Sequence, residues 1–331
     1  MKVKLITSIF ILLILTGLII FLNQKFFQKT AEDQNSNLTK VKIGMGYIPN
    51  IQFTPFYVAD ENGYYEDEGL EVEFDYSMST DLLKLLGQNE LDFVIANGDE
   101  VVLAEDKDIP VKYIMTYYSK FPIAIVSLKD KEIVNPGDLK GKNIGLPGFY
   151  GSSYIGLQAF LQDQNINENE VTLSPVGYTQ VQSLTENKVD AVVVFSMNEP
   201  IQLKKLGYEV NVIELSDYLN FASAGIVASD SVIKDKNDVA KAFVRATWKG
   251  IEKTWNDHQS AFAITSNELQ LEDSVKDTQL LILQKCLEFW NSPKISEETF
   301  LETINTLESF KLIDNKKTLI DYTDNQFVES L

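Results

Sequence analysis

Short runs of apolar residues alternate with segments of helical periodicity along most of the chain after residue 40. This alternation is typical of α/β folds with a largely parallel sheet, because a helix carries the chain back between parallel strands. In the first part of the chain, the pattern predicts strands at 41–47, 70–76, 92–96 and 111–116. It predicts helices between them, at 54–62, 80–86 and 100–105.

The same pattern restarts after residue 120. Further strands are predicted at 123–127, 143–146, 171–176, 191–195 and 210–215, with helices at 154–164, 181–187 and 201–206. After one more strand, at 224–228, the periodicity becomes helical over 237–255, 259–265, 274–290 and 297–312. The sequence therefore predicts two α/β units and a helical C-terminal region.

The N-terminal segment differs from everything that follows it. Residues 5–22 form an uncharged apolar run with lysines on both sides, and no small-residue cleavage pattern follows. The length suits a short membrane-spanning helix. We predict that residues 1–30 are an uncleaved anchor, with a cleaved signal peptide as the alternative, and that residues 31–40 are a linker. Either alternative places the rest of the chain outside the cytoplasm, periplasmic or secreted if the segment is cleaved.

Composition narrows the possible partners. The net charge of −19 argues against binding to nucleic acid and favours a soluble monomer. Because Cys286 is the only cysteine, an internal disulfide is excluded, and so is tethering by a lipid-modified N-terminal cysteine. No cofactor is expected.

Candidate ligand-binding residues follow the predicted strands, where ligands bind in open α/β sheets. The loop after the first strand offers Tyr47, Asn50, Gln52 and Phe53. The loop at 145–154 is rich in glycine and adds Phe149, Tyr150, Ser152 and Ser153, the serines standing where a helix begins. It lacks the lysine and the glycine spacing of phosphate and dinucleotide loops.

Polar side chains follow three other strands. They are Asn97 and Asp99, Tyr178 and Gln180, and Asn198 and Glu199. Asn97 or Asp99 would also serve as a helix cap, and Glu199 as a surface partner of a helix dipole. If these groups face a cleft, carboxylates beside amides suit a flat heterocycle with amino groups, and suit a sulfonate poorly. Aromatic residues gather near the same strand ends, among them Tyr117 and Phe121, and their faces stack on flat ligands.

Enzyme chemistry has little support. His258 is the only histidine, and both it and Cys286 lie outside every candidate loop, so a catalytic triad or a histidine–cysteine metal site is not predicted. The acidic run Glu66–Glu68 lacks the spacing of a calcium loop. Composition alone does not exclude a pair of glycosidase carboxylates.

Two segments of the chain resemble sequence signatures of a known protein family. The segment 61–72, ENGYYEDEGLEV, and the segment 136–142, PGDLKGK, resemble signatures of solute-binding proteins that serve ABC importers. With the loop 47–50, YIPN, the chain is most similar to the branch that binds thiamine pyrimidine precursors and related heterocycles, over about residues 41–260.

The resemblance implies a two-lobed periplasmic binding protein fold of type II. Lobe one would comprise 41–119 and 224–331, lobe two 120–223, and the hinge would lie near 118–123 and 219–224. The implied function is capture of a flat nitrogen heterocycle, a thiamine pyrimidine precursor or a riboflavin-like vitamin, for delivery to an ABC permease. The alternatives are a binding protein for a small oxyanion such as taurine or an alkyl sulfonate, and a biosynthetic enzyme for the thiamine pyrimidine.

Overall fold

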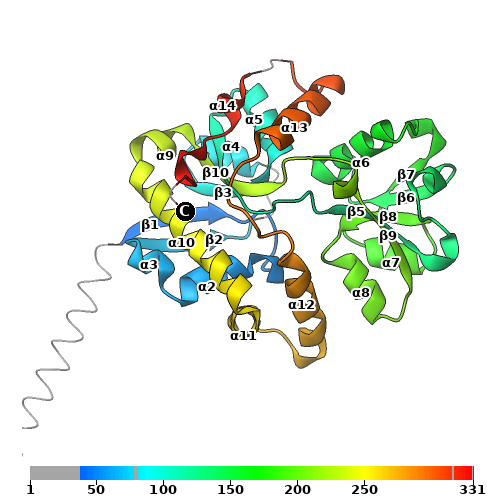
Figure 1. The fold of residues 1–331 in the computed structure, drawn as a ribbon, viewed down its shortest axis with the longest axis horizontal. Helices are drawn as coiled ribbons and strands as arrows, with labels where there is room; N and C mark the ends of the chain where they lie inside the picture. The colour runs from blue at the N-terminus through cyan, green and yellow to red at the C-terminus, as the bar shows by residue number, and fades with distance from the viewer. Residues whose placement is uncertain (1–37, 78–80, 315–316, 330) are drawn as a thin grey trace, which may run out of the picture.

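Two five-stranded sheets flanked by helices form two lobes that lie side by side in the computed structural model of the chain (Figure 1). The structure describes residues 38–77, 81–314, 317–329 and 331. The first sheet has the order β2-β1-β3-β10-β4 and the second the order β7-β6-β8-β5-β9. Their strands are β1 Thr39–Gly44, β2 Leu70–Asp75, β3 Phe93–Asn97, β4 Val111–Thr116, β5 Ile123–Leu128, β6 Asn143–Leu146, β7 Thr172–Pro175, β8 Ala191–Phe195, β9 Val210–Glu214 and β10 Ala224–Ser229.

Both sheets are built in the same way. β1 pairs in parallel with β2 and β3, and β6 pairs in parallel with β7 and β8. β10 lies antiparallel between β3 and β4, and β5 lies antiparallel between β8 and β9. The expectation of a largely parallel sheet therefore missed one reversed strand in each sheet. Each reversed strand is the first one after the chain arrives from the other lobe, so no crossover helix sets its direction.

Every predicted helix has a counterpart within a few residues. The helices are α2 Thr54–Glu61, α4 Leu82–Gly87, α5 Gly98–Asp106, α6 Gly151–Asp163, α7 Gln180–Thr185, α8 Glu199–Lys205, α10 Asn237–Asn256, α11 His258–Glu268, α12 Asp273–Cys286 and α13 Glu297–Ser309. Periodicity missed three short helices, α3 Tyr64–Asp67, α9 Asp230–Asp235 and α14 Leu319–Tyr322. Helices this short complete few turns, so their helical repeat is weak and easily overlooked.

The long helix α10 organises the core of lobe one. The ring of Phe243 stacks on Phe93 of β3, with centroids 4.2 Å apart, and on Tyr65, at 5.5 Å. α10 also packs against α2, and Gly250 permits the close approach, because a Cβ there would lie 2.2 Å from the carbonyl oxygen of Pro55. The C-terminal helices thus complete the lobe that begins the chain.

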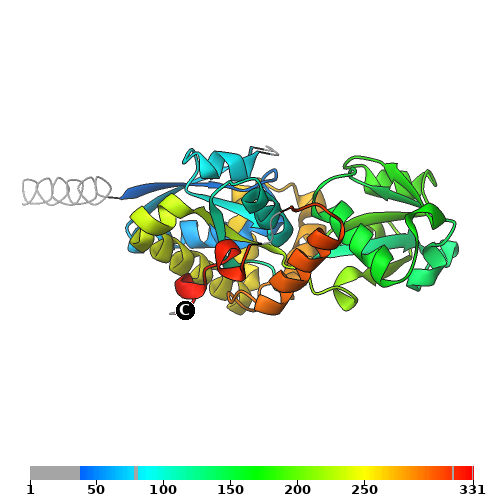
Figure 2. The ribbon, with the colours of Figure 1, turned by 90° about the horizontal axis from the view of Figure 1, so that it is seen from above.

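The chain passes between the lobes twice, after β4 and after β9 (Figure 2). The two passages are in contact, since the rings of Phe121 and Phe221 meet with centroids 5.5 Å apart. The buried ring of Phe121 also covers Gly156 of α6, where a Cβ would lie 2.5 Å from it. Met197, from the loop after β8, is fully buried in the core of lobe one. The lobes therefore share packed surfaces around the passages.

The predicted N-terminal anchor, residues 1–30, lies outside the described residues. Among the helices that the structure does describe, none is long and apolar enough to cross a membrane.

Candidate ligand-binding cleft

The carboxyl ends of the parallel strands of the two lobes approach each other at one place. The hydroxyl of Ser152, at the start of α6, donates a 2.7 Å hydrogen bond to Oδ1 of Asp99, at the start of α5. The rings of Tyr47 and Tyr178, from the loops after β1 and β7, lie with centroids 6.2 Å apart. Four residues predicted from the sequence as ligand-binding therefore meet across the two lobes.

Lobe one presents the first turn of α5. The backbone N–H and the side-chain amide of Asn97 donate to Oε2 of Glu100 at 2.8 and 3.1 Å, so Asn97 caps the helix. The N–H of Gly98 donates to the carbonyl oxygens of Ala222 and Ser223 in the second passage, both at 3.2 Å. The start of α5 is thereby attached to the segment that connects the lobes.

Asp99 is the most deeply buried carboxylate of this surface, with 1% of the residue exposed. Its Oδ1 accepts from Ser152, while its Oδ2 is buried without a hydrogen-bond partner among the described residues. Desolvation, with the charge of Glu100 beside it, raises the pKa of Asp99 to about 7. Near neutral pH the group is therefore partly protonated and can accept or donate.

Lobe two presents Glu199 at the start of α8. Its Oε2 accepts from the N–H of Phe195 at 3.0 Å, and its Oε1 accepts from the side-chain amide of Asn198, also at 3.0 Å. Gln202 donates in turn to Oδ1 of Asn198 at 2.8 Å. Burial raises the pKa of Glu199 to about 7. The charge of Glu199 helps to raise the pKa of Tyr47, after desolvation, so the carboxylate lies near the tyrosine pair.

Exposed aromatic rings lie on the loops before α6 and α7 of lobe two. Phe149, Tyr150 and Tyr178 are 52%, 60% and 62% exposed. Phe149 meets Tyr154 edge to face at 5.8 Å, and Tyr150 lies close enough to Tyr178 to raise the pKa of its hydroxyl further. Large exposed rings on one surface are typical of a site that stacks on a ligand.

Several predicted residues lie elsewhere or serve the fold. Phe53, Tyr117 and Phe121 are buried in the core, and Gln180 is buried in α7. In this conformation their side chains are packed in the interior, and their predicted contact with a ligand stays a prediction. Aromatic rings next to the passages bury more apolar area by packing there than by lining a cleft.

The first loop is also partly structural. The side chain of Asn50 accepts from the N–H of Gln52 at 3.0 Å, and the carbonyl of Gln52 accepts from the hydroxyl of Tyr117 at 2.7 Å. Asn50 lines a hollow of about 380 Å³ with Tyr76 and Glu268. Ser153 lies beside Ser152 in the first turn of α6 and is partly exposed.

The sequence analysis missed two polar residues near the cleft. Ser196, at the end of β8, and Ser223, before β10, are each 3% exposed, and neither hydroxyl has a partner among the described residues. The position of Ser196 directly after a buried strand was a usable signal. Ser223 gave none, because its place beside Gly98 depends on the return of the chain from lobe two.

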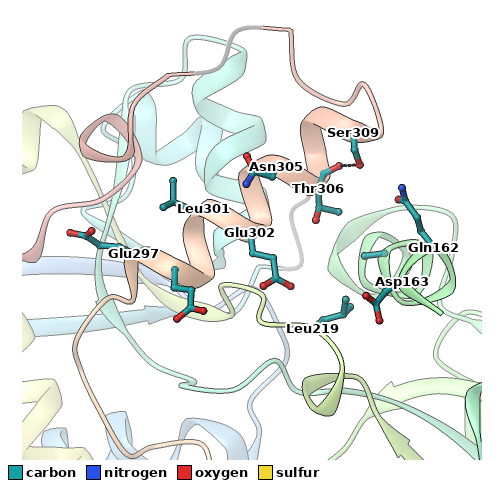
Figure 3. Close-up of a pocket in the computed structure, with 11 residues that line it drawn as sticks. Gln162, Asp163, Leu219, Glu297, Leu301, Glu302, Asn305, Thr306 and Ser309 are labelled. Carbon is teal, nitrogen blue, oxygen red and sulfur yellow. Dashed lines mark hydrogen bonds between the residues drawn. The ribbon is translucent and has the colours of Figure 1, made fainter. Parts of the chain in front are cut away.

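A larger hollow of about 850 Å³ lies between the lobes on the outer part of α6 (Figure 3). Gln162 and Asp163 of α6 face Glu302 and Asn305 of α13 across it, and Leu219 lies at its base. Its lining carries four carboxylates and no basic residue, and it does not include Asp99, Ser152, Tyr47 or Tyr178. The sequence analysis did not predict it.

The described residues contain no group of histidine, cysteine and carboxylate side chains that is arranged to hold a metal ion. Cys286 is buried in α12, and burial raises the pKa of its thiol. His258 begins α11. Lys120, a basic residue near the cleft, is exposed and forms no ion pair with the described residues.

The fold is that of the two-lobed periplasmic binding proteins. A solved ligand-binding component of an ABC-type import system from Staphylococcus aureus, determined with zinc bound, superposes with a TM-score of 0.68 at 14% identity. The alignment covers 87% of this chain and 97% of that one. The predicted two-lobed fold is confirmed.

The chain belongs to the NMT1/THI5-like family, which matches residues 50–261. A riboflavin-binding protein, RibY, of Chloroflexus aurantiacus is 37% identical over 79% of this chain and 76% of its own length. A formylaminopyrimidine-binding protein of Halalkalibacterium halodurans is 26% identical over 85% and 88%. A 4-amino-5-hydroxymethyl-2-methylpyrimidine phosphate synthase of Legionella pneumophila is 22% identical over 68% of this chain and 72% of its own length. The resemblance found in the sequence is confirmed, and the relatives of higher identity are binding proteins.

Proposed function

We propose that this chain is the extracytoplasmic solute-binding component of an ABC importer and that its ligand is a flat nitrogen heterocycle. The observation that carries the proposal is that the two lobes contact each other through Asp99 with Ser152 and through Tyr47 with Tyr178, with the carboxylate of Glu199 near Tyr47. Rings stack on a planar ligand, and carboxylates accept hydrogen bonds from ring or amino N–H groups. The ligand would enter between the lobes and be enclosed by hinge closure.

The relatives favour a flavin-like ligand first and an aminopyrimidine second, which reverses the order expected from the sequence. RibY is more similar to this chain than the formylaminopyrimidine-binding protein is. Our proposed ligand-binding set remains the residues chosen from the sequence, with Asp99, Ser152, Tyr47, Tyr178 and Glu199 at its centre.

The remaining parts of the proposal follow from the same function. Lobe one comprises 41–119 and 224–331 and lobe two 120–223, with the hinge in the two passages. The partner is a membrane permease, and the N-terminal segment tethers a monomer near it. Non-catalytic binding is favoured over synthase activity, because Cys286 is buried in α12 and His258 begins α11, both outside the cleft.

A melting experiment tests the function. The full chain is unfolded and refolded to remove endogenous ligand, and its melting temperature is measured with riboflavin, formylaminopyrimidine, thiamine, taurine and an alkyl sulfonate. A ligand that binds only the folded state raises the melting temperature by mass action. We expect riboflavin to give the largest shift. A shift with the sulfonate alone would overturn the heterocycle proposal in favour of an oxyanion ligand.

The variant Glu199→Gln separates the two ligand classes. A heterocycle that donates N–H groups loses an acceptor in this variant, so its melting shift should shrink. An anion is repelled by a carboxylate, so its binding should stay unchanged or improve.

A further inference from the structure

The two oxygens of the Asp99 carboxylate differ in their hydrogen bonding. One oxygen of this carboxylate holds Ser152 of the other lobe, and the second is buried without a partner. Buried polar atoms in native proteins nearly always have a partner, so an orphan is expected where a bound group supplies one. Apart from Asp99 and Ser152, the predicted polar residues Asn97, Asn198, Glu199 and Asn50 form their side-chain hydrogen bonds within their own lobes.

We propose that Asp99 accepts a hydrogen bond from a ring N–H of the ligand through Oδ2 while Oδ1 holds Ser152, so that a single carboxylate both recognises the ligand and couples its binding to lobe closure. This inference rests on the proposed function. It assigns to Asp99 a role that differs from that of the other cleft residues, because the Ser152 contact exists only when the lobes are together.

The surroundings of Asp99 support this role. The residue is held in place from behind, because Gly98 bonds to the second passage and a Cβ on Gly98 would lie 2.3 Å from Cβ of Ala222. The carboxylate therefore has little freedom to turn away from the cleft. A donor placed against Oδ2 also stabilises the ionised form, which in turn is the better acceptor for the Ser152 hydroxyl. Ligand and closure are thus expected to reinforce each other.

Riboflavin and 3-methylriboflavin are suitable probes, because methylation removes the ring imide N–H and leaves the ring system intact. Affinities are measured by quenching of flavin fluorescence, and closure is measured as the decrease in radius of gyration by small-angle X-ray scattering. The wild type is expected to bind riboflavin at least about tenfold more tightly than 3-methylriboflavin.

Two variants separate recognition from closure. Ser152→Ala should weaken riboflavin binding several-fold and reduce closure, while the preference for riboflavin over the methylated flavin remains. Asp99→Ala should weaken binding about tenfold or more and should also lose that preference, because no acceptor remains for the ligand N–H. Asp92→Asn, at the other end of β3, is the matched control and should change neither quantity.

The outcomes are distinguishable. If the wild type binds neither flavin nor formylaminopyrimidine, the proposed function fails and this inference falls with it. If the wild type binds riboflavin but Asp99→Ala keeps the preference, recognition by Asp99 is wrong. If Ser152→Ala closes as the wild type does, the coupling is wrong.

Discussion

Asp99 and Glu199 occupy equivalent positions in the two lobes. Each lies in the first turn of the helix that follows the third strand of its parallel set, β3 or β8, and burial raises the pKa of each to about 7. Their partners differ. Both oxygens of Glu199 are held within its own lobe, by Phe195 and Asn198. Asp99 has one partner in the opposite lobe and one orphaned oxygen.

Glu199 is therefore held by its own lobe, whereas the hydrogen bond of Asp99 depends on how the two lobes are placed. Under the proposed hinge closure, Glu199 would keep its orientation, because its partners lie in its own lobe. Asp99 would lose Ser152 when the lobes separate. The proposed binding site would then have one wall ready before the ligand arrives and another that is completed by closure.

The largest expected effect comes from the residues that precede the two carboxylates. Gly98→Ala should lower the free energy of unfolding by about 2–3 kcal/mol, because its Cβ would overlap Ala222 at the passage. Asn198→Ala, the corresponding change in lobe two, should cost about 1 kcal/mol, through loss of its hydrogen bonds to Glu199 and Gln202. Urea denaturation of both variants measures the difference. Equal costs would show that the two strand ends are held equally tightly.

The carboxylates themselves should respond to a different extent at pH 8. Asp99→Asn is expected to stabilise the unliganded protein by about 1 kcal/mol, because it removes a buried charge that has no partner on one side. Glu199→Gln should change the stability by less than that, because removal of its charge is offset when one carbonyl oxygen cannot serve both the Phe195 N–H and the Asn198 amide.

The pH dependence of the Asp99→Asn effect follows from linkage. The pKa of Asp99 rises from 3.8 to about 7 on folding, so the folded state holds a proton that the unfolded state releases between these values. Stability from this group is therefore present at about pH 4 and is lost as the pH rises to 7. The advantage of asparagine should grow over that range in melting curves. A difference that is constant from pH 4 to pH 8 would contradict the assignment.

The smallest effect is expected at a further contact between the lobes, where Lys285 of α12 lies 3.6 Å from Glu214 of β9. Both side chains are partly exposed, so Lys285→Met should change the free energy of unfolding by less than about 0.5 kcal/mol. Melting at low and high salt measures it. A loss as large as that in Gly98→Ala would mean that this ion pair, and not the packed passages, holds the lobes together.

Much of the fold could be predicted from the sequence, because most of its strands and longer helices leave a period or an apolar run in the pattern of apolar positions. The predicted strand 111–116 coincides with β4, and 143–146 with β6. The direction of the strands within each sheet could not be predicted in this way. The reversal of β10 and β5 depends on how the chain enters a sheet from the other lobe, and no local pattern records that.

The residue types at the candidate site could be predicted from the sequence, but the packing of some of these side chains could not. Asp99, Ser152, Tyr47 and Tyr178 were chosen because they follow strands, and the structure brings them together. Phe121 was chosen for the same reason, yet it fills the space over Gly156. The sequence shows that an aromatic ring lies near a strand end but not which neighbours compete for it.

The position of β10 has a consequence for how the protein is made. This strand lies between β3 and β4, but it begins at residue 224, more than one hundred residues after β4 ends at Thr116. At a synthesis rate of about 5–20 residues per second, β4 waits on the order of 10 s for the strand that pairs with it. The second sheet needs only strands between residues 123 and 214, and its β5, which ends at Leu128, has a shorter wait for β8, which begins at Ala191. The lobe that is translated first is therefore the one whose sheet is completed last.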